Sequence, residues 1–419
     1  MSMSRNMRKN VAVVSALTLA GALAACSTGS GDSATSGSSD ASGDRVTIEV
    51  WDYEGQGVSN DAMNAAVAAF EAANPGIKVN RTSFAFGDLS KSIVQGGVGG
   101  EVPDVAIIDT VDNQNFASLG LLADITDATA DMKDEFYEGP WSSTQLDGKT
   151  YGLPMNSNNL ALFYNKTMFE AAGITAAPTT WDELATTAKA LATDGKAGLA
   201  ISGVKNEQGT FQVLPFVWQT GGDVENYDVA GAEALTYLKG LIDSGAVSSA
   251  VANYTQEDAR TQFTTSQTAM MVNGPWEISN LADVDFEWDV APLPVGKEAA
   301  TGMGGENIVL FQEAKNAEAG LKFVEFMASH DGVQTFCDVS GQLSPRPDLD
   351  GKLKLSSDPK MQVFEKQMEI THARAYGAQY AKISEAIQLS IQEALTGAKT
   401  PDAAAKDAFA TIQPLLPTE

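Results

Sequence analysis

Short apolar runs alternate with helix-like spacing of hydrophobic residues in the first part of the chain. Residues 46–51, 77–79 and 105–108 form runs that predict strands, and between the first two runs Met63 and Phe70 lie on one face of a predicted helix. Strands that alternate with helices indicate a parallel sheet, and the ligands of such sheets gather at the carboxyl ends of the strands. The pattern therefore selects the loops that follow the strands, at residues 52–57, 84–87 and 109–113.

The alternation continues beyond residue 150 with longer helices. Thr180-Trp181-Asp182-Glu183 has the form of a capping box and predicts a helix that extends to Thr193. From Val284 to Val290, apolar and acidic residues alternate, which is typical of a strand with one buried face. Further strands are expected at residues 160–164, 199–201 and 269–272, and further helices from Asp228 and at residues 316–329, 359–371, 378–395 and 402–412.

Residues 147–166 interrupt this pattern with a patch that is polar but uncharged. Gly152 and Pro154 break any single regular element, and Asn156-Ser157-Asn158-Asn159 then precede a buried-looking strand. A chain of 419 residues exceeds what one hydrophobic core usually covers, so two domains are expected. A crossing between them here would place amide and hydroxyl groups at a domain junction, where ligand clefts are common. Residues 292–306 and 340–347 are expected to be further crossings.

The first 44 residues differ in composition from the rest. Three basic residues within the first nine positions precede the apolar run 11–25, which is too short to span a membrane and is typical of a secretory signal peptide. Leu23-Ala24-Ala25-Cys26 resembles the lipobox of bacterial lipoproteins, so Cys26 is expected to be lipidated; the alternative is a plain secretory signal with a chance cysteine. Residues 26–44 contain almost only small and polar residues and predict a flexible tether. We therefore expect an exported chain held by lipid on the outer face of the cell membrane.

The chain is strongly acidic, with a formal net charge of −27. Because residues 1–25 contain three basic and no acidic residues, the remainder has 24 basic and 54 acidic residues and a charge of −30. Such a surface repels nucleic acid and anionic lipid and favours a neutral or cationic small ligand. With Cys26 assigned to lipid, Cys337 has no disulfide partner and is expected in the core.

The residues of common catalytic sites are scarce. The two histidines, His330 and His372, lie outside any HExxH or GxSxG motif, which makes a zinc site or a Ser-His-Asp site improbable. Alternating acids between Asp283 and Asp289 could bind calcium but are more typical of a solvated strand face. No metal or cofactor is therefore expected. Paired carboxylates for glycoside hydrolysis stay open among 54 acidic residues, because their spacing in space is not visible in a sequence.

Aromatic and hydrogen-bonding residues gather at the expected strand ends and crossings. Sugars need both kinds, because their C–H faces pack on aromatic rings while each hydroxyl donates and accepts hydrogen bonds. Trp276, after Asn273-Gly274-Pro275 at an expected helix start, is the strongest aromatic candidate, whereas Trp51 is expected in the core and Arg346 could instead be a hinge contact. The predicted ligand-binding residues are Tyr53, Glu54, Phe86, Asp109, Asp112, Asn156, Asn158, Trp218, Trp276, Gly305, Glu306, Arg346 and Tyr376.

Several segments together resemble the extracellular solute-binding proteins of ABC importers, in the sugar-binding group related to maltose-binding protein. They include Ala68 to Val79 (AAFEAANPGIKV), Tyr151-Gly152-Leu153-Pro154, Leu162 to Lys166 (LFYNK), Pro178 to Leu184 (PTTWDEL) and Met271 to Trp276 (MVNGPW). The matching segments span nearly all of the chain after the tether, in the family's order. The loop after the first strand is shorter than in maltose-binding protein, which argues against a strict specificity for maltose.

The resemblance implies an α/β, two-lobe fold of the periplasmic-binding-protein type with a hinged cleft between the lobes. The lobes would comprise residues 45–150 with 303–342, and residues 151–302 with 343–419. The implied function is binding a carbohydrate, in particular an oligosaccharide, and delivering it as a monomer to an ABC importer permease, without catalysis. The alternatives are a secreted, lipid-anchored glycosidase and a binding protein for a peptide or a cationic small solute.

Overall fold

The computed structural model describes residues 45–417. The predicted signal peptide, the lipidation site Cys26 and the whole of the predicted tether lie outside the described residues. Within residues 45–417, no helix combines the length and the apolar character needed to cross a bilayer.

The first sheet has five strands in the order β2-β1-β3-β12-β6. Strand β1 pairs in parallel with β2 and β3, whereas β12 is antiparallel to both β3 and β6, so the sheet is mixed rather than purely parallel as the alternation predicted. Its strands are β1 (Val46–Asp52), β2 (Ile77–Ser83), β3 (Val105–Asp109), β6 (Leu153–Pro154) and β12 (Glu306–Leu310).

Helices cover both faces of this sheet. Successive residues of a strand point to opposite faces, and accordingly Ile107 packs in one cluster with Phe70, whereas Ile108 packs in another with Phe116. The first face is covered by α1 (Gly57–Ala73), α11 (Ala317–Ala328) and α12 (His330–Ser340), and the second by α2 (Phe86–Gly99) and α3 (Asn113–Ser118). The hydrophobic core of this part therefore has two layers separated by the sheet.

The second sheet has four strands in the order β10-β7-β9-β8. Its central pair, β7 with β9, is antiparallel, and the edge strand β8 runs parallel to β9. The strands are β7 (Ala161–Asn165), β8 (Ala197–Ala200), β9 (Thr268–Asn273) and β10 (Trp288–Ala291). Every residue of β9 is buried, because helices pack on both of its faces.

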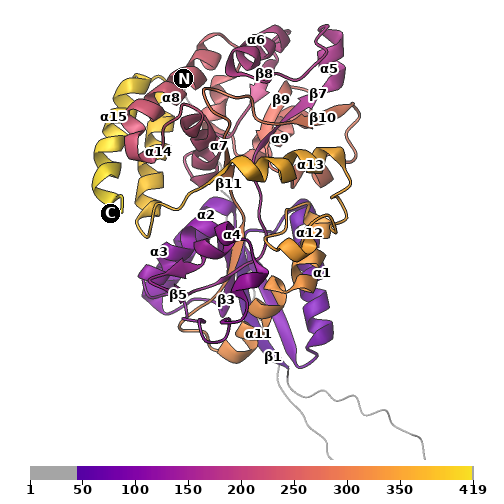
Figure 1. Cartoon of the computed structure of the whole chain (residues 1–419), viewed down its shortest axis with the longest axis vertical. Coiled ribbons are helices and arrows are strands. Elements are labelled where there is room, and N and C mark those ends of the chain that lie inside the picture. Colours follow the sequence, from indigo (N-terminus) through magenta and orange to yellow (C-terminus); the bar gives the residue numbers. More distant parts are fainter. Residues whose placement is uncertain (1–44, 418–419) are drawn as a thin grey trace, which may run out of the picture. The chain divides into compact units, whose positions relative to one another are not determined.

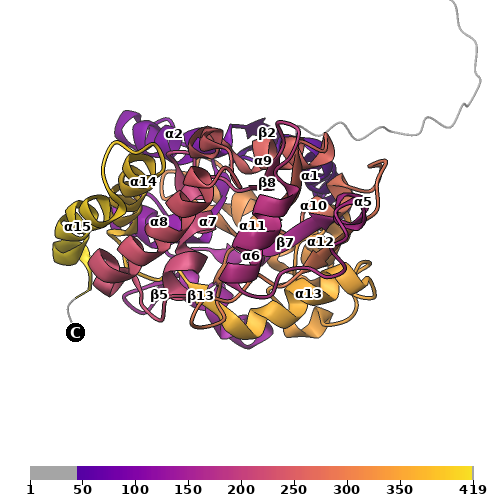
Figure 2. The ribbon, with the colours of Figure 1, turned by 90° about the horizontal axis from the view of Figure 1, so that it is seen from above.

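One face of the second sheet carries a helical layer that includes the last two α-helices, α14 and α15. Figure 2 shows α14 and α15 beside α8 on one side of the molecule, away from α5 and α13. The helices of this layer are α6 (Trp181–Leu191), α7 (Glu207–Trp218), α8 (Tyr227–Asp243), α14 (Tyr380–Leu395) and α15 (Pro401–Ile412). The opposite face packs against α9 (Gln256–Thr264), α10 (Glu277–Asn280) and α13 (Pro359–Gln367). The remaining short elements are α4 (Glu138–Ser143), α5 (Lys166–Ala171), β4 (Gln145–Leu146), β5 (Lys149–Thr150), β11 (Thr301–Met303) and β13 (Thr371–Ala373).

Three segments that are distant in the sequence lie side by side between the two sheets. Ser157 pairs with Leu343 and Asn158 pairs with Gly304 in isolated antiparallel bridges. Strand β11, which leads into Gly304, lies between the elements of the two sheets in Figure 1. The stretches expected to be crossings therefore meet at one place, although the lobe boundaries drawn from them stay a prediction.

Three local predictions were wrong or incomplete. Residues 284–287 are not a strand, because only Trp288–Ala291 finds a partner, in β7. Helix α7, which ends at Trp218, was not predicted. Helix α12 was not predicted at all. The expected position of Cys337 in the core is confirmed.

Candidate ligand-binding site

The ends of three strands of the first sheet bring polar side chains together. Strands β1 and β3 end at Asp52 and Asp109, and β12 begins beside them because Glu306 is paired with Asp109. Tyr53, directly after β1, donates a hydrogen bond to Glu306 Oε1 at 2.9 Å. The first crossing joins them, since the Glu306 N–H donates to Asn156 Oδ1 at 3.0 Å. Strand ends and crossing thus form one hydrogen-bonded group.

Gly305 lets the return crossing lie against the first crossing. Its φ of +143° lies in a region that L side chains rarely adopt. A Cβ atom at this position would come within 2.5 Å of the Asn156 carbonyl oxygen. The Gly305 carbonyl accepts a hydrogen bond from Thr110 N at 3.1 Å, just after β3. Glycine is therefore required where Asn156, Glu306 and the end of β3 converge.

Arg374 connects this group to the helices of the second sheet. Its guanidinium donates to Asp109 Oδ1 at 3.1 Å and to Glu207 Oε1 at 2.5 Å. The same guanidinium lies 4.4 Å from the centroid of the Phe211 ring. Glu207 also accepts hydrogen bonds from Tyr380, at 2.6 Å, and from Ser384, both on α14. A continuous polar network therefore runs from β3 to α7 and α14.

Buried polar atoms without a hydrogen-bond partner concentrate at this junction. Among residues 45–417, six of them lie on the strand ends, the crossings and the segment after β13: Asn113 Nδ2, Asn156 Nδ2, Asn158 Oδ1, Glu306 Oε2, Gln342 Oε1 and Arg374 Nε. Buried polar groups without partners are costly, so water or a ligand normally satisfies them. The set contains both donors and acceptors, as the recognition of hydroxyl groups requires.

Burial raises the pKa of several carboxyl groups around the same junction. Desolvation, together with the charge of Glu54, raises the pKa of Glu306 to about 8. Desolvation, together with the charge of Asp109, likewise raises the pKa of Asp112 to about 8. Desolvation is also the main cause that raises the pKa of Glu54 to about 7 and that of Glu277 to about 7. Acidic groups thus outnumber the arginines that could neutralise them.

The sequence pattern of one family, described as "Bacterial extracellular solute-binding protein", matches residues 56–334. The chain belongs to this family. A putative binding protein of Brucella abortus is 28% identical to it over 362 residues, which are 83% of this chain and 88% of the relative. The maltooligosaccharide ABC transporter solute-binding lipoprotein of Streptococcus pneumoniae is 26% identical over 438 residues, which are 98% of each chain.

A solved structure supports the same assignment. The ABC transporter solute-binding protein of Thermotoga lettingae bound with α-D-tagatose superposes with a TM-score of 0.81 at 27% identity, covering 89% of this chain and 100% of that chain. The expected α/β, two-lobe fold of the solute-binding proteins is therefore confirmed.

The aromatic candidates of this solute-binding protein differ in their surroundings. Tyr53 and Phe86 form an edge-to-face pair at the strand ends, with ring centroids 4.8 Å apart. Trp276 is half-buried, and its ring lies so close to Gly274 that a Cβ atom there would be 2.0 Å from Trp276 Cζ3. Trp51 is also half-buried and packs beside Phe84, rather than lying fully in the core.

Trp218 and Tyr376 are buried in the second part of this solute-binding protein. The Trp218 indole N–H donates to Asp223 at 2.8 Å and to the Tyr376 hydroxyl at 3.1 Å, and the Tyr376 hydroxyl itself donates to Asp223. The Trp218 ring stacks on His372 with centroids 5.1 Å apart. Their hydrogen bonds are therefore made within the protein.

Arg346 also has its full set of partners within the protein. It donates to Glu135 at 2.8 Å, to Asp348 at 3.1 Å and to the Ala328 carbonyl at 2.9 Å, and its guanidinium lies over the Phe136 ring. These residues belong to the first sheet's side of the molecule, and Arg346 lies near the end of the third crossing. This environment is that of a structural contact beside the crossing, which is the alternative that the flanking prolines suggested.

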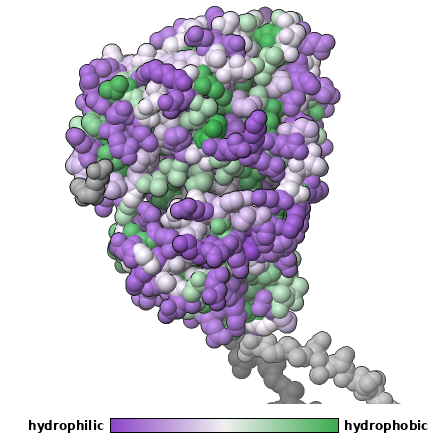
Figure 3. All heavy atoms as spheres, viewed as in Figure 1, coloured by the Kyte–Doolittle hydropathy of each residue, from purple (hydrophilic) through white to green (hydrophobic). Residues whose placement is uncertain are grey.

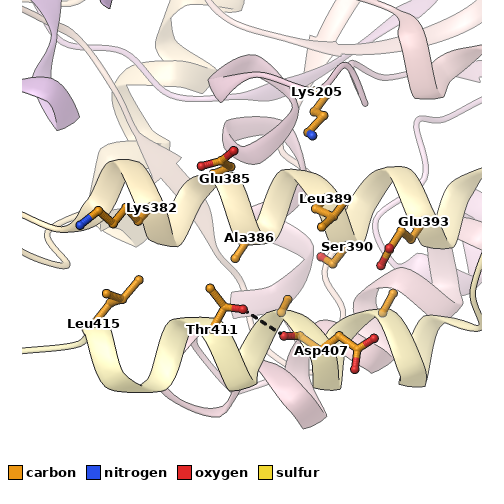
Figure 4. A pocket seen from close by; sticks show the side chains of 12 residues that line it. Lys205, Lys382, Glu385, Ala386, Leu389, Ser390, Glu393, Asp407, Thr411 and Leu415 are labelled. Atoms are coloured by element: carbon orange, nitrogen blue, oxygen red, sulfur yellow. Dashed lines mark hydrogen bonds between the residues drawn. The ribbon is translucent and has the colours of Figure 1, made fainter. Parts of the chain in front are cut away.

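Two hollows among the described residues differ in volume and in position. A groove of about 530 Å³ lies between α14 and α15 and is lined by side chains of both helices and by Lys205 (Figure 4), away from the predicted site residues. A hollow of about 30 Å³, enough for a single water molecule, lies between Val111, Met303 and Arg374. In the space-filling view an indentation crosses the face between the two halves (Figure 3).

Sequence reasoning missed the residues that complete the network. Arg374, Glu207 and Phe211 were not predicted, because each lies on a segment without turn or strand-end signals. One signal was available: a single arginine between apolar residues in His372-Ala373-Arg374-Ala375-Tyr376 is expensive to bury unless acidic partners accompany it. The partners themselves, 265 and 167 residues away, could not have been identified.

Proposed function

We propose that this protein binds a carbohydrate, in particular an oligosaccharide, and delivers it to the permease of an ABC importer. It would act as a monomer, held by a lipid on Cys26 at the outer face of the cell membrane. The relatives named as maltooligosaccharide-binding and the tagatose-bound structure support a sugar ligand. The observation that carries the proposal is the gathering of unpartnered donors and acceptors at the junction of the two sheets, beside the rings of Tyr53 and Phe86.

The proposal includes movement of two lobes, comprising residues 45–150 with 303–342 and residues 151–302 with 343–419. Ligand would bridge both walls only in the closed form, which supplies the differential affinity that drives closure. The hollow beside Arg374 holds about 30 Å³, far less than a sugar ring needs, so the lobes would have to separate before a ligand enters. The adjacent crossings at Asn158, Gly304 and Leu343 are the proposed hinge.

The ligand would be held by the predicted residues at the strand ends and the first crossing. Glu306, Asp109 and Asn156 would bind hydroxyl groups, and Tyr53 with Trp276 would pack on the sugar rings. Gly305 would allow the close approach of the two crossings. Trp218, Tyr376 and Arg346 are proposed to support the site from behind, because their polar groups are already paired.

A thermal-shift screen of mono- to tetrasaccharides, followed by calorimetry, tests the proposal. A bound sugar is expected to raise the melting temperature and to change tryptophan fluorescence. Trp276→Ala should abolish both responses, because it removes the proposed stacking surface. Trp276→Phe keeps a flat ring and should retain binding within about tenfold, and the unliganded melting temperature of each variant controls for folding. Unchanged binding in Trp276→Ala would remove Trp276 from the site.

Product analysis separates this proposal from hydrolysis. Two buried carboxyl groups with raised pKa, Glu54 and Glu306, are of the kind that a glycosidase uses as acid and base. Incubation with each bound oligosaccharide should return it intact, because transport requires an unaltered ligand. New reducing ends that disappear in a Glu306→Gln variant would establish the enzyme instead.

A further inference from the structure

Glu306 has one carboxyl oxygen that no protein group satisfies. Its side chain is 7% exposed, and Oε1 accepts the hydrogen bond from Tyr53. Oε2 has no hydrogen-bond partner among residues 45–417. A buried carboxylate normally has several partners, because desolvation without them is unfavourable. Glu306 therefore leaves a strong acceptor unused at the centre of the proposed site.

The charges that face Glu306 are negative. Glu54 and Asp109 are the charged groups that act on it, and both raise its pKa. The nearby arginines form ion pairs with other carboxylates: Arg81 pairs with Asp52 at 2.8 Å, and Arg374 pairs with Asp109 and Glu207. Among the ion pairs of residues 45–417, none involves Glu306 or Glu54. An ionised Glu306 would therefore have no positively charged partner among residues 45–417.

The Asn156 side chain lies beside the Glu306 carboxyl group and partly offsets the rise in its pKa that desolvation causes. Asn156 is 1% exposed, its Oδ1 accepts from the Glu306 N–H, and its Nδ2 has no partner in the described part of the chain. An amide N–H donor suits a sugar hydroxyl, whereas a free carboxylate oxygen suits a cationic donor. The Tyr53 and Phe86 rings provide aromatic surface beside both, and aromatic rings also attract ammonium groups.

We propose that the carbohydrate recognised at this site carries a protonated amine, which binds Glu306 Oε2 while a neighbouring hydroxyl accepts from Asn156 Nδ2. This inference rests on the proposed function and specifies its ligand class as an amino sugar. The ammonium group supplies the missing positive charge and allows Glu306 to ionise. Binding of the amine is therefore coupled to release of a proton from the site.

Calorimetry with matched sugars tests the inference. The probes are glucosamine, N-acetylglucosamine and glucose, together with the β-1,4-linked dimers of each. Glucosamine or its dimer is expected to bind at least about tenfold more tightly than both neutral counterparts, as one charge-assisted hydrogen bond provides. Titrations in buffers of different ionisation enthalpy should show proton release for the amine and none for the neutral sugars.

The variant Glu306→Gln keeps the shape of the side chain and removes the charge. It should lower affinity for the amine at least about tenfold more than it lowers affinity for the matched neutral sugar. Glu318→Gln, on the exposed face of α11, is the matched control and should leave the preference unchanged. Tyr53→Phe is the second test if Glu306→Gln fails to fold: it removes the donor to Oε1, destabilises the ionised carboxylate and should lower amine affinity by a larger factor than neutral-sugar affinity.

The outcomes separate the two proposals. Binding of neutral sugars as tight as that of their amines, or a preference that Glu306→Gln does not change, would overturn the amine inference and leave the carbohydrate function standing. Tight binding of spermidine with no response to any sugar would overturn both, since the ligand would then be a simple cation.

Discussion

Arg374 is a buried cation shared by two nearly buried carboxylates. Its side chain is 1% exposed, and those of Asp109 and Glu207 are 13% and 15% exposed. Removing one member of such a set leaves the others charged and desolvated, which costs about 3–5 kcal/mol. We therefore expect Arg374→Ala to lower the free energy of unfolding by that amount in urea denaturation. Adding Asp109→Asn to the variant should recover part of the loss.

Arg346→Ala is the matched control. Arg346 is equally buried, but its partners Glu135 and Asp348 are 44% and 45% exposed, so water can solvate them once the arginine is gone. Its loss should be at most about 2 kcal/mol, mostly from packing and the Ala328 hydrogen bond. Equal losses in the two variants would contradict the view that stranded carboxylates dominate at Arg374.

At the scale of single residues, the sequence predicted those candidate site residues that lie at strand ends and crossings. Tyr53 and Asp109 could be predicted because a strand end is a local signal and parallel strands end at one edge, whereas Glu306, at the start of an antiparallel strand, was predicted from the return crossing. Asn156 could be predicted because an uncharged polar patch lies between two apolar segments. Arg374 and Glu207 could not be predicted, because they are recognised only by their contacts with residues more than 160 positions away in the sequence.

The start of helix α6 is the element that the sequence defines most sharply. Thr180 accepts a hydrogen bond from Glu183 N at 3.3 Å, as the capping pattern predicted, and Glu183 in turn accepts from Thr179. Loss of an N-cap side chain typically costs about 1 kcal/mol. Thr180→Ala should therefore lower the free energy of unfolding by about 1 kcal/mol and leave ligand affinity unchanged, because no predicted site residue lies on α6.

The serine variant separates capping from packing. Thr180→Ser keeps the oxygen and should be nearly as stable as the original chain. If Thr180→Ser is as destabilised as Thr180→Ala, the lost methyl group rather than the cap is responsible, and the capping argument fails.

Other elements show where a periodic pattern is insufficient. Residues 284–287 alternate like a strand, yet the pairing with β7 begins only at Trp288. A strand requires a partner for its backbone, and alternation says nothing about one. Helix α12 was overlooked although Val333, Phe336 and Cys337 have helical spacing, because Ser329 both ends α11 and caps α12, so no loop separates the two helices.

At the scale of the whole molecule, the three crossings and the segment after β13 hold the two sheets in contact. The positions of the crossings followed from Gly, Pro and Asn content, but the closeness of Asn158 to Gly304 and of Ser157 to Leu343 is visible only in three dimensions. Three carboxyl groups with raised pKa, those of Glu54, Asp112 and Glu306, lie at the same junction, and that of Glu277 lies on α10. The raised pKa values therefore act together on the stability of the whole molecule, because these groups titrate in the same pH range.

The sign of the resulting pH dependence follows from proton linkage. Glu54, Asp112, Glu277 and Glu306 have a pKa of about 7 to 8 in the folded chain, above the ordinary values of 4.5 for Glu and 3.8 for Asp. Between these limits the folded state binds more protons than the unfolded state, so the free energy of unfolding falls as pH rises. We expect the melting temperature to decrease from about pH 5 to about pH 8 and to level off above.

Substitution distinguishes this cause from general repulsion in an acidic chain, which acts in the same direction. Glu54→Gln combined with Glu306→Gln should flatten the decrease, because two of the titrating groups are gone. Glu101→Gln combined with Glu225→Gln removes the same charge at exposed positions and should leave the slope largely unchanged. A melting temperature that rises over this range, or equal flattening in both pairs, would show that the buried carboxyl groups do not control stability. An amine ligand should reduce the decrease of the melting temperature, because its positive charge favours the ionised form of Glu306, one of the titrating groups.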